Sequence, residues 1–261
     1  MTMTGPDRDD MLRVVALLPP LAVRLYGDSP DAAVQRLLLL ALALGIVYAW
    51  AVLFARSVAR PAGWGLPAFA LMFVVLLPGP VAWGGAALAL SFGAVFGREI
   101  FGGRAILPPA LVALAFAIFS FPAGGFEAQG VLARSPDLLL AASCLPGAAV
   151  LVLRGSLAWQ VAAGAVAGAA AAGALMGDAA WWQHPGLGAF AAAVLFLAAA
   201  PESAVGRQGA RWLHGILVGA LVVVIRLADP DQPDGVVFAA LLGALFAPLL
   251  DRALNWRTRH G

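Results

Sequence analysis

Apolar runs fill this 261-residue chain and are broken only by short segments that carry most of its charges. The run over residues 33–55 contains a single charged side chain, Arg36. Soluble globular proteins have about 25% charged residues, whereas here 11% of residues are charged and 62% are hydrophobic. Because lipid cannot hydrogen-bond exposed backbone, such runs form helices in a membrane. The chain is therefore predicted to be an all-α polytopic membrane protein.

Ten membrane spans are predicted from the apolar runs. They cover about residues 11–26, 33–55, 64–82, 84–97, 106–121, 137–153, 158–177, 186–200, 211–228 and 235–251. A helix perpendicular to the membrane needs ~20 residues, and several of these runs are shorter. Short spans indicate tilted helices, half-helices or central positions shielded from lipid.

The placement of arginine gives the predicted topology. With ten spans and the N-terminus inside, the inside segments hold twelve of the sixteen basic residues, all arginine, and the outside segments hold four. The four are Arg24, Arg36, Arg134 and Arg226. With nine spans the split falls to ten against six. The positive-inside rule therefore favours ten spans with both termini cytoplasmic, in a bacterial inner membrane. The same placement of arginine explains the basic pI, so no nucleic-acid partner is predicted.

Two short patterns recur in the same order in the two halves of the chain. Residues 18–23 resemble residues 145–150, and residues 68–80 resemble residues 189–201 at a constant offset of 121. Five spans per repeat is an odd number, so the second repeat is predicted to be inverted relative to the first. The predicted organisation is a cytoplasmic tail at 1–10, a first five-helix repeat at 11–122, an external loop at 123–136, a second five-helix repeat at 137–252 and a cytoplasmic tail at 253–261.

Two charged breaks, residues 98–109 and 226–235, interrupt the apolar pattern at matching places in the two halves. Non-helical backbone at membrane depth is tolerated only where it is packed in protein or lines a wet cavity. Inverted-repeat folds commonly place their functional site between interrupted segments of this kind. We therefore expect the two breaks to form one functional region.

Glycines spaced four apart predict close helix packing, because each pair lies on one helix face. The interpretation favoured here is packing within the bundle rather than an oligomer interface. The pairs are Gly93/Gly97, Gly164/Gly168, Gly173/Gly177 and Gly215/Gly219.

Several stretches resemble the NqrB/RnfD family, the membrane subunits of the sodium-pumping NADH:quinone reductase and of the Rnf electron-transport complex. In the first half these are residues 91–103, 109–111 and 119–122. In the second half, Arg211 to Asp251 follows the family pattern of an Ile-Arg pair, a Pro-rich turn and a closing Phe-Ala-Pro-Leu-Leu-Asp. The resemblance covers about residues 11–252.

The resemblance implies a ten-helix fold of inverted repeats, a flavin in the first half, a second flavin on an outside loop, and coupling of electron flow to ion movement. Its implied partners are the other membrane and redox subunits of such a complex. The positions matching a non-covalent flavin, FMN or riboflavin, are Gly102, Gly103 and Pro109. The positions matching an ion path are Arg98, Glu99, Arg226, Asp234 and Asp251. Arg98 and Glu99 of the first break are expected to face Arg226 and Asp234 of the second.

The chain departs from the family pattern where a flavin would be attached. Family members carry FMN covalently on a threonine of the outside loop, but residues 122–137 contain no threonine. Ser135 is in that loop without the attachment motif. The glycine-rich string of the first break is also shortened and loses two asparagine amides. Covalent FMN is therefore predicted to be absent, and a non-covalent flavin stays open.

No metal site or nucleotide-binding motif is predicted. Cys144 is the only cysteine and lies in an apolar run, and no second histidine lies at metal-ligand spacing from His214. Three functions stay open: a subunit of an ion-translocating redox complex, which is favoured; a transporter or channel for a small solute or ion on the same scaffold; and a non-catalytic scaffold for redox partners.

Overall fold

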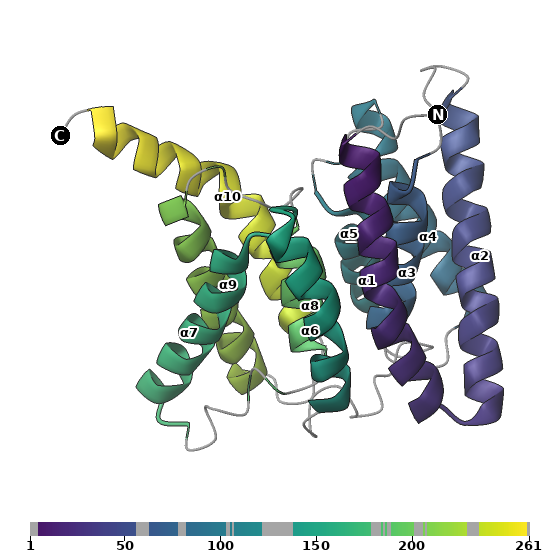
Figure 1. Cartoon of the computed structure of the whole chain (residues 1–261), viewed down its shortest axis with the longest axis horizontal. Coiled ribbons are helices and arrows are strands. Elements are labelled where there is room, and N and C mark those ends of the chain that lie inside the picture. Colours follow the sequence, from purple (N-terminus) through teal and green to yellow (C-terminus); the bar gives the residue numbers. More distant parts are fainter. Residues whose placement is uncertain are drawn as a thin grey trace. The chain divides into compact units, whose positions relative to one another are not determined.

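The described residues are helical, and no strand occurs among them (Figure 1). The computed structural model describes residues 5–55, 63–77, 82–102, 105, 107–121, 138–178, 184, 186, 189–200, 206, 208–228 and 235–259. The helices are α1 (Gly5–Gly27), α2 (Pro30–Ala55), α3 (Gly65–Leu76), α4 (Trp83–Gly97), α5 (Pro109–Ser120), α6 (Leu138–Leu153), α7 (Trp159–Leu175), α8 (Phe190–Ala193), α9 (Gln208–Ala228) and α10 (Gly235–Arg259). A 3-10 turn, η1 (Glu99–Phe101), follows α4, and a π-helix, η3 (Val194–Ala198), continues α8.

The predicted all-α fold is confirmed, and each of the ten predicted spans coincides with one helical segment. The largest extensions lie at the ends of the chain, where α1 begins at Gly5 and α10 continues to Arg259, whereas α3 ends at Leu76, short of its predicted end at residue 82. Apolar runs mark only the part of a helix that avoids water, and a helix can continue beyond it because its backbone hydrogen bonds are internal. The helix α1 also runs through Pro19 and Pro20, which a sequence pattern treats as a break.

Three described helices are long and apolar enough to cross a membrane: Pro30–Ala55, Gln208–Ala228 and Gly235–Ala253. Four more described helices are apolar but shorter, namely Gly65–Leu76, Pro109–Ser120, Leu138–Leu153 and Trp159–Leu175. The twelve residues of α3 and of α5 rise only ~18 Å, against a hydrocarbon core of ~30 Å. Both helices are therefore too short to cross the core alone, and most of their residues are buried, which agrees with the expectation of half-helices or shielded central positions for the short spans.

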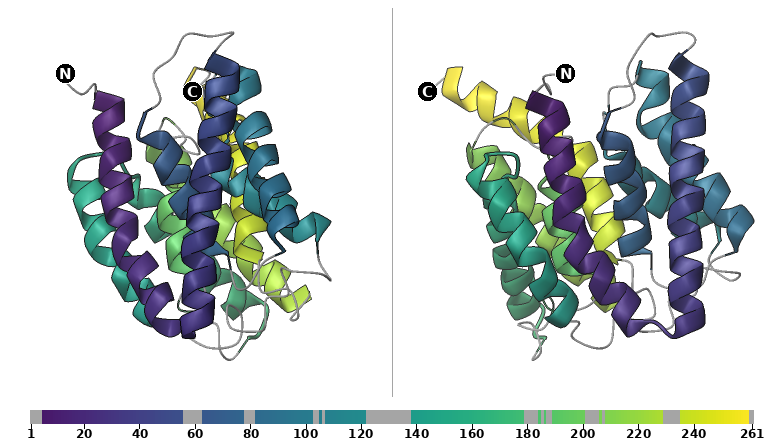
Figure 2. Two further views of the ribbon diagram at one scale, coloured as in Figure 1. Left: turned by 90° about the vertical axis from the view of Figure 1, so that its right-hand side faces the viewer. Right: turned by 45° about the vertical axis from the view of Figure 1, so that its right-hand side comes forward.

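The chain divides into two compact units, each described here by itself. The first comprises residues 1–129 and 142–153, and the second comprises residues 130–141 and 154–261. In the first unit, α1 and α2 run antiparallel, and α3 packs against α1, α2 and α5 (Figure 2). This central position explains why ten of the twelve residues of α3 are buried.

The helices of the two units pair in the same pattern. In the first unit α4 packs on α2 and α5, and in the second α9 packs on α7 and α10. Likewise α3 contacts α2 and α5, while η3 contacts α7 and α10. This shared pattern relates α2–α5 to α7–α10, whereas residues 142–153 of α6 belong to the first unit. The repeat of five helices in each half stays a prediction. The inversion of one repeat relative to the other stays a prediction.

The predicted glycine packing is found inside the units. A Cβ atom on Gly164 would lie 2.8 Å from the Trp212 carbonyl oxygen, and Cβ atoms on Gly168 and Gly219 would collide with the backbone of the opposite helix. The helices α7 and α9 are therefore in backbone contact through glycines on both sides. Gly177 has a different role, because its φ is +73° and nothing lies within 4 Å of a Cβ placed on it. It follows the end of α7, where a left-handed residue terminates a helix.

Candidate functional site

The first predicted break begins where α4 ends. Arg98 leaves the helical conformation with φ −143° and ψ −56°. Glu99–Phe101 then form a single 3-10 turn, which Gly102 closes in the left-handed region at φ 69°. A side chain with a Cβ atom is disfavoured at that φ, so a glycine at this position lets the chain turn back toward α5.

Arg98 and Glu99 form an ion pair at this turn. Their Nη1 and Oε1 atoms lie 3.6 Å apart, and the Glu99 side chain is only 9% exposed while that of Arg98 is 23% exposed. Nη1 of Arg98 is buried and makes no hydrogen bond within the described residues. The attraction between the pair is therefore electrostatic, without a short hydrogen bond.

The break is held against α5 by close packing. A Cβ on Gly97 would lie 2.8 Å from the Cα atom of Pro109, and a Cβ on Gly93 would lie 2.6 Å from the Cβ atom of Ala113. Pro109 is the first residue of α5, a position where the missing N–H of proline costs no hydrogen bond. The predicted packing role of Gly93 and Gly97 is confirmed within the first unit.

A ladder of phenylalanine rings crosses from α4 to α5 beside the break. Phe92 stacks on Phe96 with ring centroids 4.5 Å apart and on Phe116 with centroids 4.3 Å apart. Phe121 meets Phe116 edge to face at 6.3 Å. Phe92 and Phe96 lie four residues apart on one helix and face the next helix, a spacing that could have suggested the ladder from the sequence. The stacked rings join α4 to α5 within the first unit.

The described residues of the predicted flavin site offer few hydrogen-bond donors. The amide of Gly102 donates to the Glu99 carbonyl oxygen at 3.0 Å, so it is already used. Pro109 has no amide hydrogen, and Gly103 lies outside the described residues. The donor set that would hold an isoalloxazine ring is therefore not found in Gly102 and Pro109. A non-covalent flavin here stays a prediction.

At the second break, Arg226 is buried in the last turn of α9 and bonded to the backbone. Its Nη1 donates to the His184 carbonyl oxygen at 2.9 Å. His184 in turn lies 2.7 Å from Asp178 through Nε2 and Oδ2. Asp234 lies outside the described residues, and Arg226 belongs to a different unit from Arg98 and Glu99. The expectation that these four residues meet stays a prediction.

Asp251, the last predicted ion-path residue, lies on α10 and reaches the segment before α9. Its Oδ2 accepts a hydrogen bond of 3.0 Å from the Gly206 amide. The amides at a helix N-terminus lack partners within the helix, so a carboxylate beside the start of α9 is favourable. The contact, 45 residues apart in the chain, gives Asp251 a structural role in the second unit.

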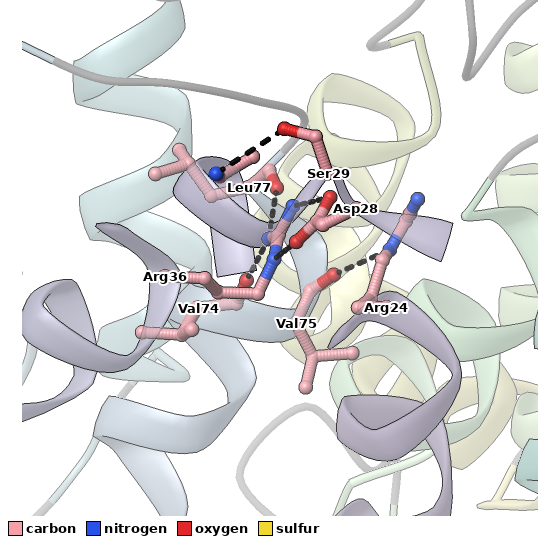
Figure 3. Close-up of polar contacts among 8 residues, drawn as sticks. Arg24, Asp28, Ser29, Arg36, Val74, Val75 and Leu77 are labelled. Carbon is pink, nitrogen blue, oxygen red and sulfur yellow. Dashed lines mark hydrogen bonds and ion pairs between the residues drawn. The ribbon is translucent and has the colours of Figure 1, made fainter. Parts of the chain in front are cut away.

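Both ends of α3 are capped by side chains from α1 and α2 or the turn between them, a feature that the sequence interpretation missed. At its C-terminal end, Nη1 of Arg36 donates to the carbonyl oxygens of Val74 (3.0 Å) and Leu77 (3.1 Å), and Nε of Arg24 donates to Val75 (3.2 Å) (Figure 3).

Asp28 anchors the guanidinium of Arg36 in this arrangement. Its two carboxylate oxygens accept from Nε at 2.6 Å and from Nη2 at 3.1 Å. At the opposite end of α3, Oδ1 of Asp7 accepts the Trp64 amide at 3.0 Å. Acidic groups at the N-terminus and guanidinium groups at the C-terminus match the dipole of the helix.

The second unit also buries polar groups that no sequence pattern singled out as interacting. His214 is fully buried on α9. Its imidazole faces the carbonyls of Ala198 and Gly243, yet neither ring nitrogen makes a well-formed hydrogen bond to a described residue. Ser156 and Gln160, just before and within α7, are also buried, and each has an oxygen without a described partner.

Comparison with known proteins decides the family. The sequence profile of the NQR2, RnfD, RnfE family matches residues 8–129 and 127–259, almost the whole chain. The chain belongs to this family. Members similar to it include a subunit of the Na(+)-translocating NADH-quinone reductase of Azotobacter vinelandii, 32% identical over 61% of this chain and 52% of that protein. The corresponding subunits from Pseudomonas paraeruginosa and Yersinia pestis are 30% and 29% identical.

The sequence resemblance to the NqrB/RnfD family is thus confirmed, and with it the membership of a multi-pass membrane protein family. The chain spans about half the length of the curated relatives it matches, since the alignments cover 52% or 51% of those proteins.

Proposed function

We propose that this member of the family is an integral membrane subunit of an ion-translocating electron-transport complex of the Nqr or Rnf type. It resides in the bacterial inner membrane with both termini cytoplasmic, and partner subunits supply the electron donor and acceptor. The proposal is supported by the family membership and by relatives that are named as subunits of Na(+)-translocating NADH-quinone reductase.

The observation that carries the ion-translocating role is the Arg98–Glu99 pair at the helix break. A charge at membrane depth costs about 2.5–3.5 kcal/mol even on the mildest scale, and such residues usually mark ion pathways. The two charges offset one another, but their 3.6 Å separation is longer than a hydrogen bond. A cation arriving at Glu99 would therefore compete with Arg98 for the carboxylate, and its departure would restore the pair.

Electron transfer through this chain proceeds without covalent FMN in our proposal. The support is the loop 122–137, which contains no threonine to carry the attachment. If a flavin binds non-covalently at the first break, it supplies the redox chemistry there. The chain's own contribution at this turn is the Arg98–Glu99 pair.

Ion uptake measured with and without redox partners tests this function. Inside-out membrane vesicles containing the assembled complex should accumulate Na⁺ or H⁺ when the electron donor is added, and an inhibitor of electron transfer should stop the uptake. Liposomes containing only this chain should show no uptake. Uptake by the chain alone, without an electron donor, would instead establish a transporter or channel. Electron transfer by the complex with no accompanying ion movement would leave only a scaffold role.

A further inference from the structure

We propose that the C-terminal end of α3 is a binding site for a guanidinium cation, and that the chain's own Arg36 occupies it. Four acceptor atoms from two parts of the first unit converge on this side chain (Figure 3). The carbonyl oxygens of Val74 and Leu77 accept from Nη1 at 3.0 and 3.1 Å. The Asp28 carboxylate accepts from Nε at 2.6 Å and from Nη2 at 3.1 Å.

These acceptors form a binding site because the fold itself, and not Arg36, places them together. The last carbonyls of any helix lack partners within the helix, and the same end carries the negative pole of the helix dipole. The Asp28 side chain is 18% exposed and that of Arg36 is 8% exposed. If the guanidinium were removed, a largely buried carboxylate and two carbonyl oxygens would be left facing one another without a cation, which is costly.

The arrangement of the oxygens selects a planar cation with several donors. Asp28 receives two N–H groups in a bidentate pair, which an ammonium or a metal ion cannot reproduce because it has no planar fork of donors. The third nitrogen bridges the carbonyls of Val74 and Leu77. The chemical class expected in this site is therefore a guanidinium ion, rather than a free alkali cation.

Arg24 also binds the C-terminal end of α3. Its Nε donates to the carbonyl oxygen of Val75 at 3.2 Å, between the two carbonyls that Arg36 holds. Two tethered cations, one from α1 and one from α2, thus fix the end of a buried twelve-residue half-helix. The same half-helix also packs on α5.

Chemical rescue of an arginine deletion tests the site. The full chain with Arg36→Ala is purified in nanodiscs, and its melting temperature is followed by tryptophan fluorescence while methylguanidinium chloride is added in the millimolar range. We expect a lowered melting temperature that recovers at least half of its loss with saturable dependence. Wild type, whose site is filled, should show no such rise. Absence of a saturable recovery would overturn the proposal.

Two controls establish the selectivity and the location. Sodium chloride at the same concentrations should not restore Arg36→Ala, and an equal recovery with it would overturn the assignment to guanidinium. Arg98→Ala removes a guanidinium that pairs with a carboxylate at a single 3.6 Å contact, so methylguanidinium should leave its melting temperature unchanged. Recovery in Arg98→Ala would show a general effect and would count against the site.

Further variants keep the test decisive if Arg36→Ala does not fold. Arg36→Met retains the aliphatic stem in the bundle and is titrated in the same way. Adding Asp28→Asn to either variant removes the carboxylate half of the site, so the rescue should be lost. A rescue that survives Asp28→Asn would contradict the role of Asp28 in binding.

Discussion

Arg226 donates a hydrogen bond of 2.9 Å from Nη1 to the main-chain carbonyl of His184, joining the last turn of α9 to the segment before α8. Arg24 and Arg36 likewise donate to main-chain carbonyls, Arg24 to that of Val75 and Arg36 to those of Val74 and Leu77. Arg24, Arg36 and Arg226 are three of the four arginines that the predicted topology places on the outside. A structural bond, buried for Arg36 and Arg226 and part-buried for Arg24, gives each of them a reason to depart from the positive-inside rule.

Replacing Arg226 should therefore destabilise the second unit. Arg226→Met leaves the buried His184 carbonyl without its donor, and an unsatisfied buried acceptor costs about 1–3 kcal/mol. We expect a clearly lowered melting temperature in nanodiscs. Arg252→Met is the matched control, because Arg252 is exposed on α10 and should change the melting temperature little. A loss in the control as large as that in Arg226→Met would mean that charge, rather than the bond to His184, is responsible.

Replacing glycine by alanine should lower stability where the glycine lies in a helix–helix contact, and should not do so where the glycine lies in a helix without such a contact. A Cβ on Gly168 would overlap the backbone of Ile216, whereas nothing lies within 4 Å of a Cβ on Gly45. Gly168→Ala should cost about 1–3 kcal/mol through overpacking. Gly45→Ala should be neutral or stabilising by up to about 1 kcal/mol, because alanine has the better helix propensity. Thermal unfolding of the two variants side by side measures the difference, and equal melting temperatures would contradict the tight α7–α9 contact.

The helices could be predicted from the sequence far better than the contacts that hold them. Apolar runs located every helical segment because a membrane leaves the backbone no other choice. The Arg98–Glu99 pair was also predictable, since the two residues are adjacent. The cap on α3 was not, because Val74 lies 38 residues from Arg36 in the chain and the charge of Arg36 looked like a topological signal. Asp251 and Gly206 are likewise brought together only by folding.

The π-helix could not have been predicted for a different reason. Residues 190–200 are entirely alanine, leucine, phenylalanine and valine, and such a run favours an ordinary α-helix. The change of hydrogen-bonding pattern at Val194–Ala198 occurs where the helix packs against α7 and α10. Its C-terminal end carries Ala198, whose carbonyl the imidazole of His214 faces, so the least regular helix of the second unit lies beside a fully buried histidine.

The topology prediction can be checked with reporter fusions. A cytoplasmic reporter joined after Gly261 should be active, and a periplasmic one at the same position should be silent. The reason is the twelve-to-four split of arginines, which the positive-inside rule converts into cytoplasmic termini. A fusion within the loop 123–136 should give the opposite pattern. The reverse result at Gly261 would place the C-terminus outside. An odd number of spans per repeat would then lose its support, and so would the argument that the second repeat is inverted.

Covalent flavin should be absent from the purified chain. The loop at residues 122–137 contains no threonine, and all three threonines, Thr2, Thr4 and Thr258, lie near the ends of the chain. A denaturing gel viewed under ultraviolet light should show no fluorescent band at the position of this chain. A band that disappears in Ser135→Ala would show attachment at that serine and overturn the prediction.

The most direct test of the proposed ion path is Glu99→Gln. The substitution keeps the shape of the side chain but removes the charge that a passing cation would meet, and it leaves Arg98 without its ion-pair partner. If Glu99 only supports the turn, the variant should assemble poorly and retain its activity per assembled complex. If Glu99 binds the translocated ion, the variant should assemble normally and lose at least about tenfold in coupled ion uptake, corresponding to about 1.4 kcal/mol or more.

Asp231→Asn is the control for this measurement, because it also neutralises one acid near a predicted break but lies off the family pattern. Its ion uptake in membrane vesicles, normalised to the amount of assembled complex, should equal that of wild type. The salt dependence adds an independent readout: raising the concentration of the transported ion should partly restore uptake if Glu99→Gln weakens ion binding. Wild-type uptake by assembled Glu99→Gln at every ion concentration would exclude Glu99 from the path, and the proposed function would then need another carboxylate.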